Sequence, residues 1–153
     1  MTPSDAFKTM PELVIRLPEW VYSLTNGLPP LFPTPEARMD LVIALSRQNI
    51  RNQTGGPFGA GVFDEDGRLI APGVNLVTSA NCSVLHAEIM AMAMAQKTLG
   101  RYELSDGGKY RFELIASTEP CVMCFGAILW SGIRSLVCGA RSAAAEAFGF
   151  DEG

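Results

Sequence analysis

The sequence predicts an α/β fold, in which helices cover both faces of one sheet. Two observations carry this prediction. Stretches with helical spacing of apolar residues alternate along the chain with short apolar runs of strand length. The chain also has 153 residues, of which 48% are hydrophobic and 18% charged, and this is the size and composition of one globular domain with a buried core. Without internal repeats or low-complexity segments, a single domain is expected.

The first 34 residues differ from the rest of the chain. Seven of the ten prolines lie within the first 35 residues, which excludes one long helix there. The segment also carries Phe7, Trp20, Tyr22 and Phe32, more aromatic surface than a solvated tail usually exposes. We therefore expect residues 1–34 to form an extended, proline-rich arm that packs on the domain or on a second subunit. The domain itself is expected over residues 35–153.

A helix and a hairpin are expected next. The sequence TPE at 34–36 has the composition of a helix start, and apolar residues recur at roughly helical spacing from 39 to 50. The glycine pair at 55–56 ends this helix. Two short apolar runs then flank the Asp-Gly pair at 66–67, which is a strong signal for two antiparallel strands joined by a tight turn.

Helix and strand alternate in the second half of the chain. The apolar spacing predicts, in order, a helix over 86–99, a strand over 111–118, a helix over 121–131 and a strand over 133–140. A glycine follows each of these helices directly, at positions 100 and 132, where the left-handed conformation that ends many helices favours it.

Charge and composition narrow the classes of partner. The formal net charge is −4 and the isoelectric point about 5.0, and the lysines and arginines are scattered, so no basic surface for nucleic acid or anionic lipid is expected. No apolar run approaches the roughly 20 residues that span a bilayer, and no signal peptide is evident. Four cysteines are few for a disulfide scaffold. We expect a cytoplasmic protein that binds a small molecule.

One motif carries the chemistry. His86, the only histidine, precedes Glu88 by two residues, and the sequence PCVMC follows at 120–124. This spacing puts the sulfurs of Cys121 and Cys124 on one side of a helical first turn, so that His86 from a neighbouring helix start completes three corners of a tetrahedron. Such a site suits zinc (Zn²⁺) and leaves the fourth corner for water. The helix start should lower the pKa values of the thiols.

Glu88 has a different expected role. On a helix it projects about 200 degrees away from His86, yet near the helix start it can border the cavity without binding the metal. Three alternatives remain open on the residues alone. Cys82, four residues before His86, could supply a fourth ligand to a structural zinc site; the cysteine pair could be a redox pair; or His86 could be an ordinary buried histidine. The whole signature, His-x-Glu followed by Pro-Cys-x-x-Cys, favours a zinc deaminase.

From about residue 35 to its end, the chain resembles the cytidine deaminase superfamily, and the segments HAEIMA and EPCVMCFGAI carry the resemblance. The superfamily includes bacterial guanine deaminases and tRNA adenosine deaminases. The resemblance implies a three-layer α/β/α fold with a central mixed sheet of about five strands and helices on both faces. It also implies a zinc-dependent deaminase domain that forms a homodimer or a larger assembly, whereas residues 1–34 exceed the family core.

Three further stretches resemble guanine deaminases rather than tRNA-editing relatives. They are GGPFGAGVF with Phe58, GAILWSG with Trp130, and the terminal FGFDEG. The resemblance implies that Phe58 and Trp130 line a pocket for a planar base. It implies that the tail closes over the base, with Phe150 stacking on it, Asp151 beside it and Glu152 as a second proton-shuttling carboxylate.

Two more residues complete the expected substrate site. Asn75, in PGVNLVTS, matches the family asparagine that hydrogen-bonds the edge of the base, and its amide can donate and accept. The resemblance also implies a contact from the backbone N–H of Ala87.

The expected reaction is hydrolytic deamination of a free purine base, guanine to xanthine and ammonia. Zinc lowers the pKa of its bound water, and Glu88 carries the released proton to the ring nitrogen next to the carbon that bears the amine. The alternatives are a tRNA adenosine deaminase, a deaminase of another aminated heterocycle such as an aminotriazine, a pterin or cytosine, and a non-catalytic zinc module. An acidic protein lacks the phosphate contacts that a tRNA substrate needs.

Overall fold

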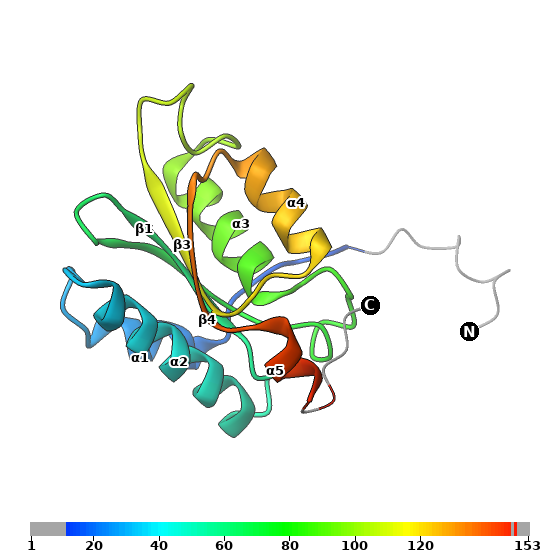
Figure 1. The fold of residues 1–153 in the computed structure, drawn as a ribbon. Coiled ribbons are helices and arrows are strands. Elements are labelled where there is room, and N and C mark those ends of the chain that lie inside the picture. Colours follow the sequence, from blue (N-terminus) through cyan, green and yellow to red (C-terminus); the bar gives the residue numbers. More distant parts are fainter. Residues whose placement is uncertain (1–11, 148, 150–153) are drawn as a thin grey trace, which may run out of the picture.

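A mixed sheet forms the centre of the computed structural model, which describes residues 12–147 and 149 (Figure 1). The strands follow the order β2-β1-β3-β4; β1 pairs antiparallel with β2 and β3, and β3 pairs parallel with β4. Along the chain, the elements are α1 (Glu19–Asn26), α2 (Pro35–Arg51), β1 (Gly59–Asp64), β2 (Leu69–Val74), α3 (Ala87–Leu99), β3 (Phe112–Thr118), α4 (Val122–Ser131), β4 (Ser135–Ala140) and α5 (Ser142–Glu146).

Helices cover both faces of the sheet, which confirms the three-layer α/β/α arrangement (Figure 1). Side chains alternate across each strand, so neighbouring residues enter different cores. Phe63 and Ile115 pack in one buried cluster with residues of α2, whereas Val62 and Leu114 pack in a second cluster with residues of α3 and α4. The metal motif lies on this second side, where the starts of α3 and α4 meet.

The described residues form four strands, and the expected count of about five was too high by one. The sequence contains only four segments with strand spacing, and the residues after β4 form the short helix α5 instead. The predicted helix and strand boundaries hold within about two residues except at the end of α2. This helix was expected to continue to the glycine pair at 55–56, and it ends at Arg51. Gly100 and Gly132 take the predicted left-handed conformation, with φ of 68° and 82°.

The arm is less extended than expected, because residues 19–26 form helix α1. Pro18 precedes this helix and no proline interrupts it, so the proline content restricts its length without preventing it. Leu17, Val21 and Phe32 are buried in the same cluster as α2. The described part of the arm therefore packs on the domain, whereas Phe7 lies outside the described residues.

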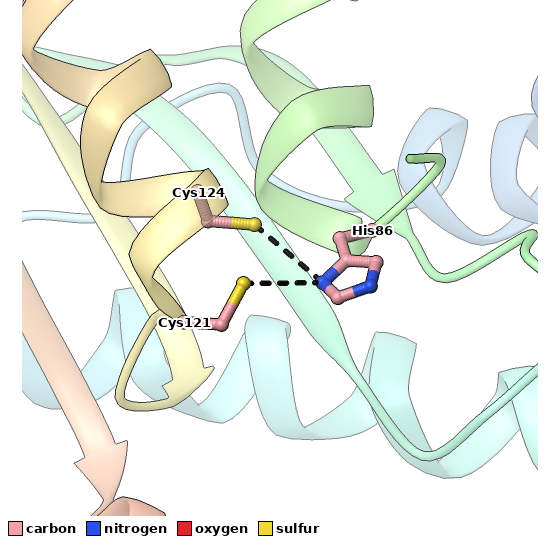
Figure 2. Close-up of side chains that lie close together, drawn as sticks. All are labelled: His86, Cys121 and Cys124. Atoms are coloured by element: carbon pink, nitrogen blue, oxygen red, sulfur yellow. Dashed lines mark hydrogen bonds between the residues drawn. The ribbon is translucent and has the colours of Figure 1, made fainter. Parts of the chain in front are cut away.

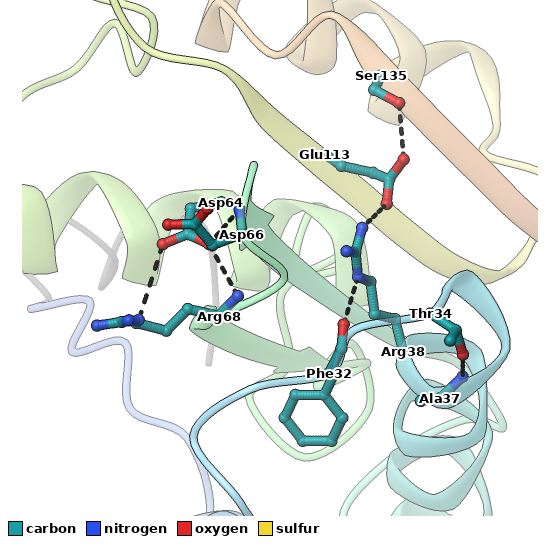
Figure 3. Close-up of polar contacts among 9 residues, drawn as sticks. All are labelled: Phe32, Thr34, Ala37, Arg38, Asp64, Asp66, Arg68, Glu113 and Ser135. Carbon is teal, nitrogen blue, oxygen red and sulfur yellow. Dashed lines mark hydrogen bonds and ion pairs between the residues drawn. The ribbon is translucent and has the colours of Figure 1, made fainter.

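An ion pair ties the end of the arm to the sheet (Figure 3). The Arg38 guanidinium donates from Nε to the Phe32 carbonyl at 2.9 Å and pairs through Nη1 with Glu113 Oε2 at 2.7 Å. Ser135 Oγ donates to the other oxygen of Glu113 at 2.8 Å. One side chain of α2 thus joins the arm, β3 and β4.

None of the helices in the described part of the chain is long and apolar enough to cross a membrane.

Candidate metal centre and pocket

Two helix starts bring the predicted metal ligands together (Figure 2). His86 and Cys121 are the extended residues directly before α3 and α4, and Cys124 lies in the first turn of α4. The Sγ atoms of Cys121 and Cys124 lie 3.7 Å and 3.6 Å from His86 Nδ1. The three ligand atoms all lie within 4.8 Å of one another.

These distances fit zinc. With Zn–S bonds of about 2.3 Å and Zn–N bonds of about 2.0–2.1 Å, the N···S edge of a tetrahedral site is about 3.6 Å long. The two distances from His86 Nδ1 to the sulfurs therefore match two edges of a zinc tetrahedron. One imidazole nitrogen and two sulfurs are also a donor set that zinc prefers.

Cys82 is not a fourth ligand. Among the described residues, the group with metal-ligand spacing holds only His86, Cys121 and Cys124. Cys82 packs instead, partly buried, against the hydrophobic cluster of α2. The structure thus brings together the three predicted ligands and leaves Cys82 outside their group.

The expected pKa shift of the thiols is wrong for Cys124. Burial raises the pKa of this thiol well above its ordinary value, and the nearby Glu88 carboxylate and Cys121 raise it further. Cys124 is fully buried, so the loss of hydration outweighs the effect of the helix start. The thiolate form at this position consequently depends on a bound cation.

A pocket of about 240 Å³ opens beside the metal group. Pockets for drug-sized ligands have roughly 300–1,000 Å³, so this pocket suits a smaller molecule. Its lining includes five residues singled out in the sequence, namely Phe58, Asn75, His86, Glu88 and Cys121. It further includes Thr118, Glu119, Pro120, Val122, Ser142, Ala145 and Glu146.

Glu88 borders this pocket from the first turn of α3 and is only 8% exposed. It is not a member of the metal group, yet it lies near enough to Cys124 to affect that thiol. Ala87, the first residue of α3, is fully buried. Its N–H belongs to the first turn, where the helix itself offers no acceptor. The proton-transfer role of Glu88 and the substrate contact of Ala87 stay predictions.

Asn75 is held in one orientation at the pocket wall and is 7% exposed. Its Oδ1 accepts hydrogen bonds from the backbone N–H groups of Gly56 at 3.3 Å and Val77 at 3.2 Å. Because both neighbours are donors, the atom facing them must be the oxygen. The Nδ2 amide is therefore the part of Asn75 that can serve a ligand, as a donor.

The structure does not bring Trp130 to this pocket. Trp130 lies at the end of α4, is 87% exposed and borders a different hollow with Glu103 and Arg134. The tail residues Phe150, Asp151 and Glu152 lie outside the described residues.

Sequence reasoning missed the wall that α5 contributes. Glu119 Oε2 accepts hydrogen bonds from the backbone N–H and the hydroxyl of Ser142, at 3.1 Å and 3.3 Å, and so holds the start of α5 beside the pocket. Ser142 and Glu146 stand in an alanine-rich stretch without a recognisable pattern. Glu119 could have been singled out from the sequence, because it directly precedes the Pro-Cys pair of the motif.

Comparison with known proteins agrees with this site. Residues 33–140 match the family model described as the cytidine and deoxycytidylate deaminase zinc-binding region. A guanine deaminase from Bacillus subtilis (strain 168) is 38% identical over 117 residues, which cover 76% of this chain and 71% of the relative.

Solved structures extend the similarity over more of the chain. A guanine deaminase from Nitrosomonas europaea is 50% identical with a TM-score of 0.86, covering 93% of this chain and 78% of the other. A structure of NE0047 in complex with 2,6-diaminopurine is 52% identical, also with a TM-score of 0.86, and covers 93% and 75%. The predicted resemblance is confirmed: the chain belongs to the cytidine and deoxycytidylate deaminase family, and within it is guanine deaminase-like.

Proposed function

We propose that this protein is a zinc-dependent hydrolase that converts guanine and water to xanthine and ammonia. The observation that carries the proposal is the metal group with tetrahedral spacing beside a buried carboxylate, in a pocket of small-molecule size. The similarity to guanine deaminases over most of the chain supports this substrate among the aminated heterocycles.

His86, Cys121 and Cys124 would hold the zinc ion, which when bound activates water as a nucleophile near neutral pH. Glu88 then takes a proton from the attacking water and delivers it to the ring nitrogen adjacent to the carbon that bears the amine. A second proton, from the hydroxyl that the attack leaves on the same carbon, must reach the amine before the C–N bond breaks and ammonia leaves. Glu88 delivers it, or Glu152 of the tail does so in the manner expected from the resemblance.

The remaining pocket residues orient the base. Asn75 donates from Nδ2 to an acceptor on the base, since its oxygen is already engaged. Phe58 forms an aromatic wall, and the N–H of Ala87 donates from the start of α3. Phe150 and Asp151, which lie outside the described residues, would close the pocket from the tail, as the resemblance implies. We regard residues 35–153 as the deaminase domain in this scheme.

We further propose that the protein forms a homodimer through α4 and acts in the cytoplasm. Val122, Phe125 and Leu129 share one side of α4 and are exposed, and Trp130 continues this apolar surface. Val122 also lines the pocket, so a subunit seated on this surface would lie next to the active site. Four cysteines are few for a disulfide scaffold, and this cysteine content favours a reducing compartment.

An ammonia-release screen tests the proposed reaction. The protein is incubated with guanine, adenine, cytosine, an aminotriazine and a tRNA anticodon stem-loop, with Glu88→Gln as the blank. We expect ammonia and stoichiometric xanthine from guanine. Inosine formed in the RNA, with no turnover of any free base, would establish the tRNA adenosine deaminase alternative and overturn the proposal.

A further inference from the structure

A chain of hydrogen bonds runs from the N-terminal arm to the pocket residue Asn75. We infer that this relay, which consists of Trp20, Thr54 and Asn49, positions Asn75 for the base and makes α1 a part of substrate recognition. The inference rests on the proposed role of Asn75, and it goes beyond the family motif, because Trp20 lies before the residues that match the family model.

The first two links join the arm to helix α2 and the loop that follows it. The indole Nε1 of Trp20 donates to Thr54 Oγ1 at 3.0 Å, and Thr54 Oγ1 donates to Asn49 Oδ1 at 2.6 Å, much shorter than its 3.3 Å distance to the Asn49 carbonyl oxygen. These contacts are partly buried, which strengthens them relative to exposed hydrogen bonds. Donor and acceptor alternate along the relay, so each link sets the direction of the next.

Asn49 connects the relay to the pocket residue Asn75. Its side chain is fully buried, and Nδ2 donates both to the Gly56 carbonyl and to the Asn75 carbonyl, each at 2.8 Å. With Oδ1 bound to Thr54, every hydrogen-bonding group of the side-chain amide except one lone pair has a partner. A flipped amide would turn its oxygen toward two carbonyl oxygens, so only one orientation is stable.

The two asparagines hold Gly56 between them. Asn49 donates to the Gly56 carbonyl, and the Gly56 N–H donates to Asn75 Oδ1. This second bond is one of the two that aim the Asn75 amide nitrogen at the ligand. A displacement of Asn49 therefore changes both the backbone position of Asn75 and the direction of its side chain.

The packing of this loop leaves little room for independent movement. A Cβ atom on Gly55 would collide with the Asn75 carbonyl oxygen and would lie 3.0 Å from Asn49 Nδ2. Backbone and side chains at this point are thus in direct contact, and a shift of the loop reaches Asn75 without being absorbed.

Two substitutions test the relay, and the first of them keeps the side-chain volume nearly constant. Thr54→Val removes the central hydroxyl, and Trp20→Phe removes the indole N–H while keeping an aromatic ring in place. We expect KM for guanine to rise about 3- to 10-fold in Thr54→Val, as for the loss of one hydrogen bond, and less in Trp20→Phe, with kcat nearly unchanged. If the variants instead lower both kcat and the melting temperature and leave KM unchanged, the relay has only a structural role and the inference is overturned.

Thr25→Val is the matched control. Thr25 also lies on α1, but its hydroxyl donates within the helix to the Val21 carbonyl at 3.0 Å. We expect this variant to retain the wild-type KM. A rise in KM equal to that of Trp20→Phe would mean that any disturbance of α1 has the same effect, and it would overturn the relay.

A double-mutant cycle with Asn75→Ala identifies the target of the relay. If Trp20 and Thr54 act through Asn75, Thr54→Val raises KM no further in the Asn75→Ala protein. Full additivity of the two effects would contradict the inference.

A measurement without turnover separates this inference from the proposed function. The side-chain amide resonances of Asn49 and Asn75 are followed by NMR in the zinc-loaded protein without substrate. We expect both to shift in Thr54→Val and Trp20→Phe and to stay in place in Thr25→Val. Unmoved Asn75 resonances would refute the relay even in an active guanine deaminase. Shifted resonances in a protein that does not deaminate guanine would refute only the proposed function.

Discussion

Helix α4 begins inside the pocket and ends far from it. At its start, Cys121 and Cys124 meet His86 at the spacing of a metal site. At its end, Trp130 is almost entirely exposed. Both ends were predicted to serve the substrate site, one from a spacing rule and the other from a resemblance. A helical spacing fixes where side chains lie relative to one another, whereas the position of a single aromatic residue depends on the contacts around it.

Next to the end of α4, the side chain of Glu103 holds a turn of the loop between α3 and β3. The Glu103 carboxylate accepts hydrogen bonds from the backbone N–H and hydroxyl of Ser105 and from the Gly107 N–H, and these bonds lower its pKa. A Cβ atom at Gly132 would collide with this carboxylate. This region therefore stabilises a loop, and its carboxylate is a suitable control for those of the pocket.

The largest expected effect is at the start of α4. We expect Cys124→Ala to remove all measurable turnover, because the zinc ion stabilises the transition state by several kcal/mol, or roughly a thousandfold. Metal analysis should show zinc lost from this variant and retained in Cys82→Ala, its control. Zinc still bound and active in Cys124→Ala would refute the ligand assignment.

Glu88→Gln should give the next largest loss. General acid–base groups contribute typically 10²–10⁴-fold, so we expect turnover to fall by about that factor while the zinc content stays at the wild-type level. Glu103→Gln, the same change at the other end of α4, should leave turnover unaltered. If the two variants turn over guanine at comparable rates, the two ends of α4 do not differ in function and Glu88 has no role in the mechanism.

The sequence was most informative where local rules decide the structure. The metal group and Glu88 lie on two helix starts, and helix starts follow from capping residues, proline and the spacing of apolar residues. The hairpin of β1 and β2 follows equally from its Asp-Gly turn. These elements and this part of the candidate site were predicted residue by residue.

Long-range contacts limited the prediction of the remaining elements and site residues. The pairing of Glu119 with Ser142 and the link from Trp20 through Thr54 to Asn49 join segments that are 23 and 34 residues apart, and neither leaves a periodic trace. Burial similarly reversed the expected pKa shift of Cys124, because the depth of a side chain depends on packing from other elements. Helix α1 was missed for a simpler reason, since the proline content, which excludes one long helix, was taken to indicate an extended arm.

Glu119→Ala should have a moderate effect on the affinity for the substrate. The change removes the acceptor for Ser142 at the start of α5, and a five-residue helix with no buried residue has little stability of its own. We expect KM to rise about threefold with a small change in melting temperature, measured by steady-state kinetics and calorimetry. Glu119→Gln, which keeps an acceptor oxygen, should restore most of the loss. A fall in kcat alone that glutamine does not restore would place the Glu119 charge in the chemistry.

The smallest expected effect on the active site is at the other end of the helix. At high protein concentration, we expect Trp130→Ala to change kcat/KM for guanine by less than about twofold, because the side chain lies outside the pocket. On dilution the variant should lose activity earlier than the wild type, since burying a large aromatic side chain on α4 would stabilise the proposed dimer. Sedimentation and activity measured over the same dilution series check this expectation. Tyr102→Ala removes an equally exposed aromatic side chain outside α4 and should follow the wild type. A loss of activity in Trp130→Ala that is the same at every concentration, with the dimer intact, would return Trp130 to the substrate site and show that the two ends of α4 serve one pocket.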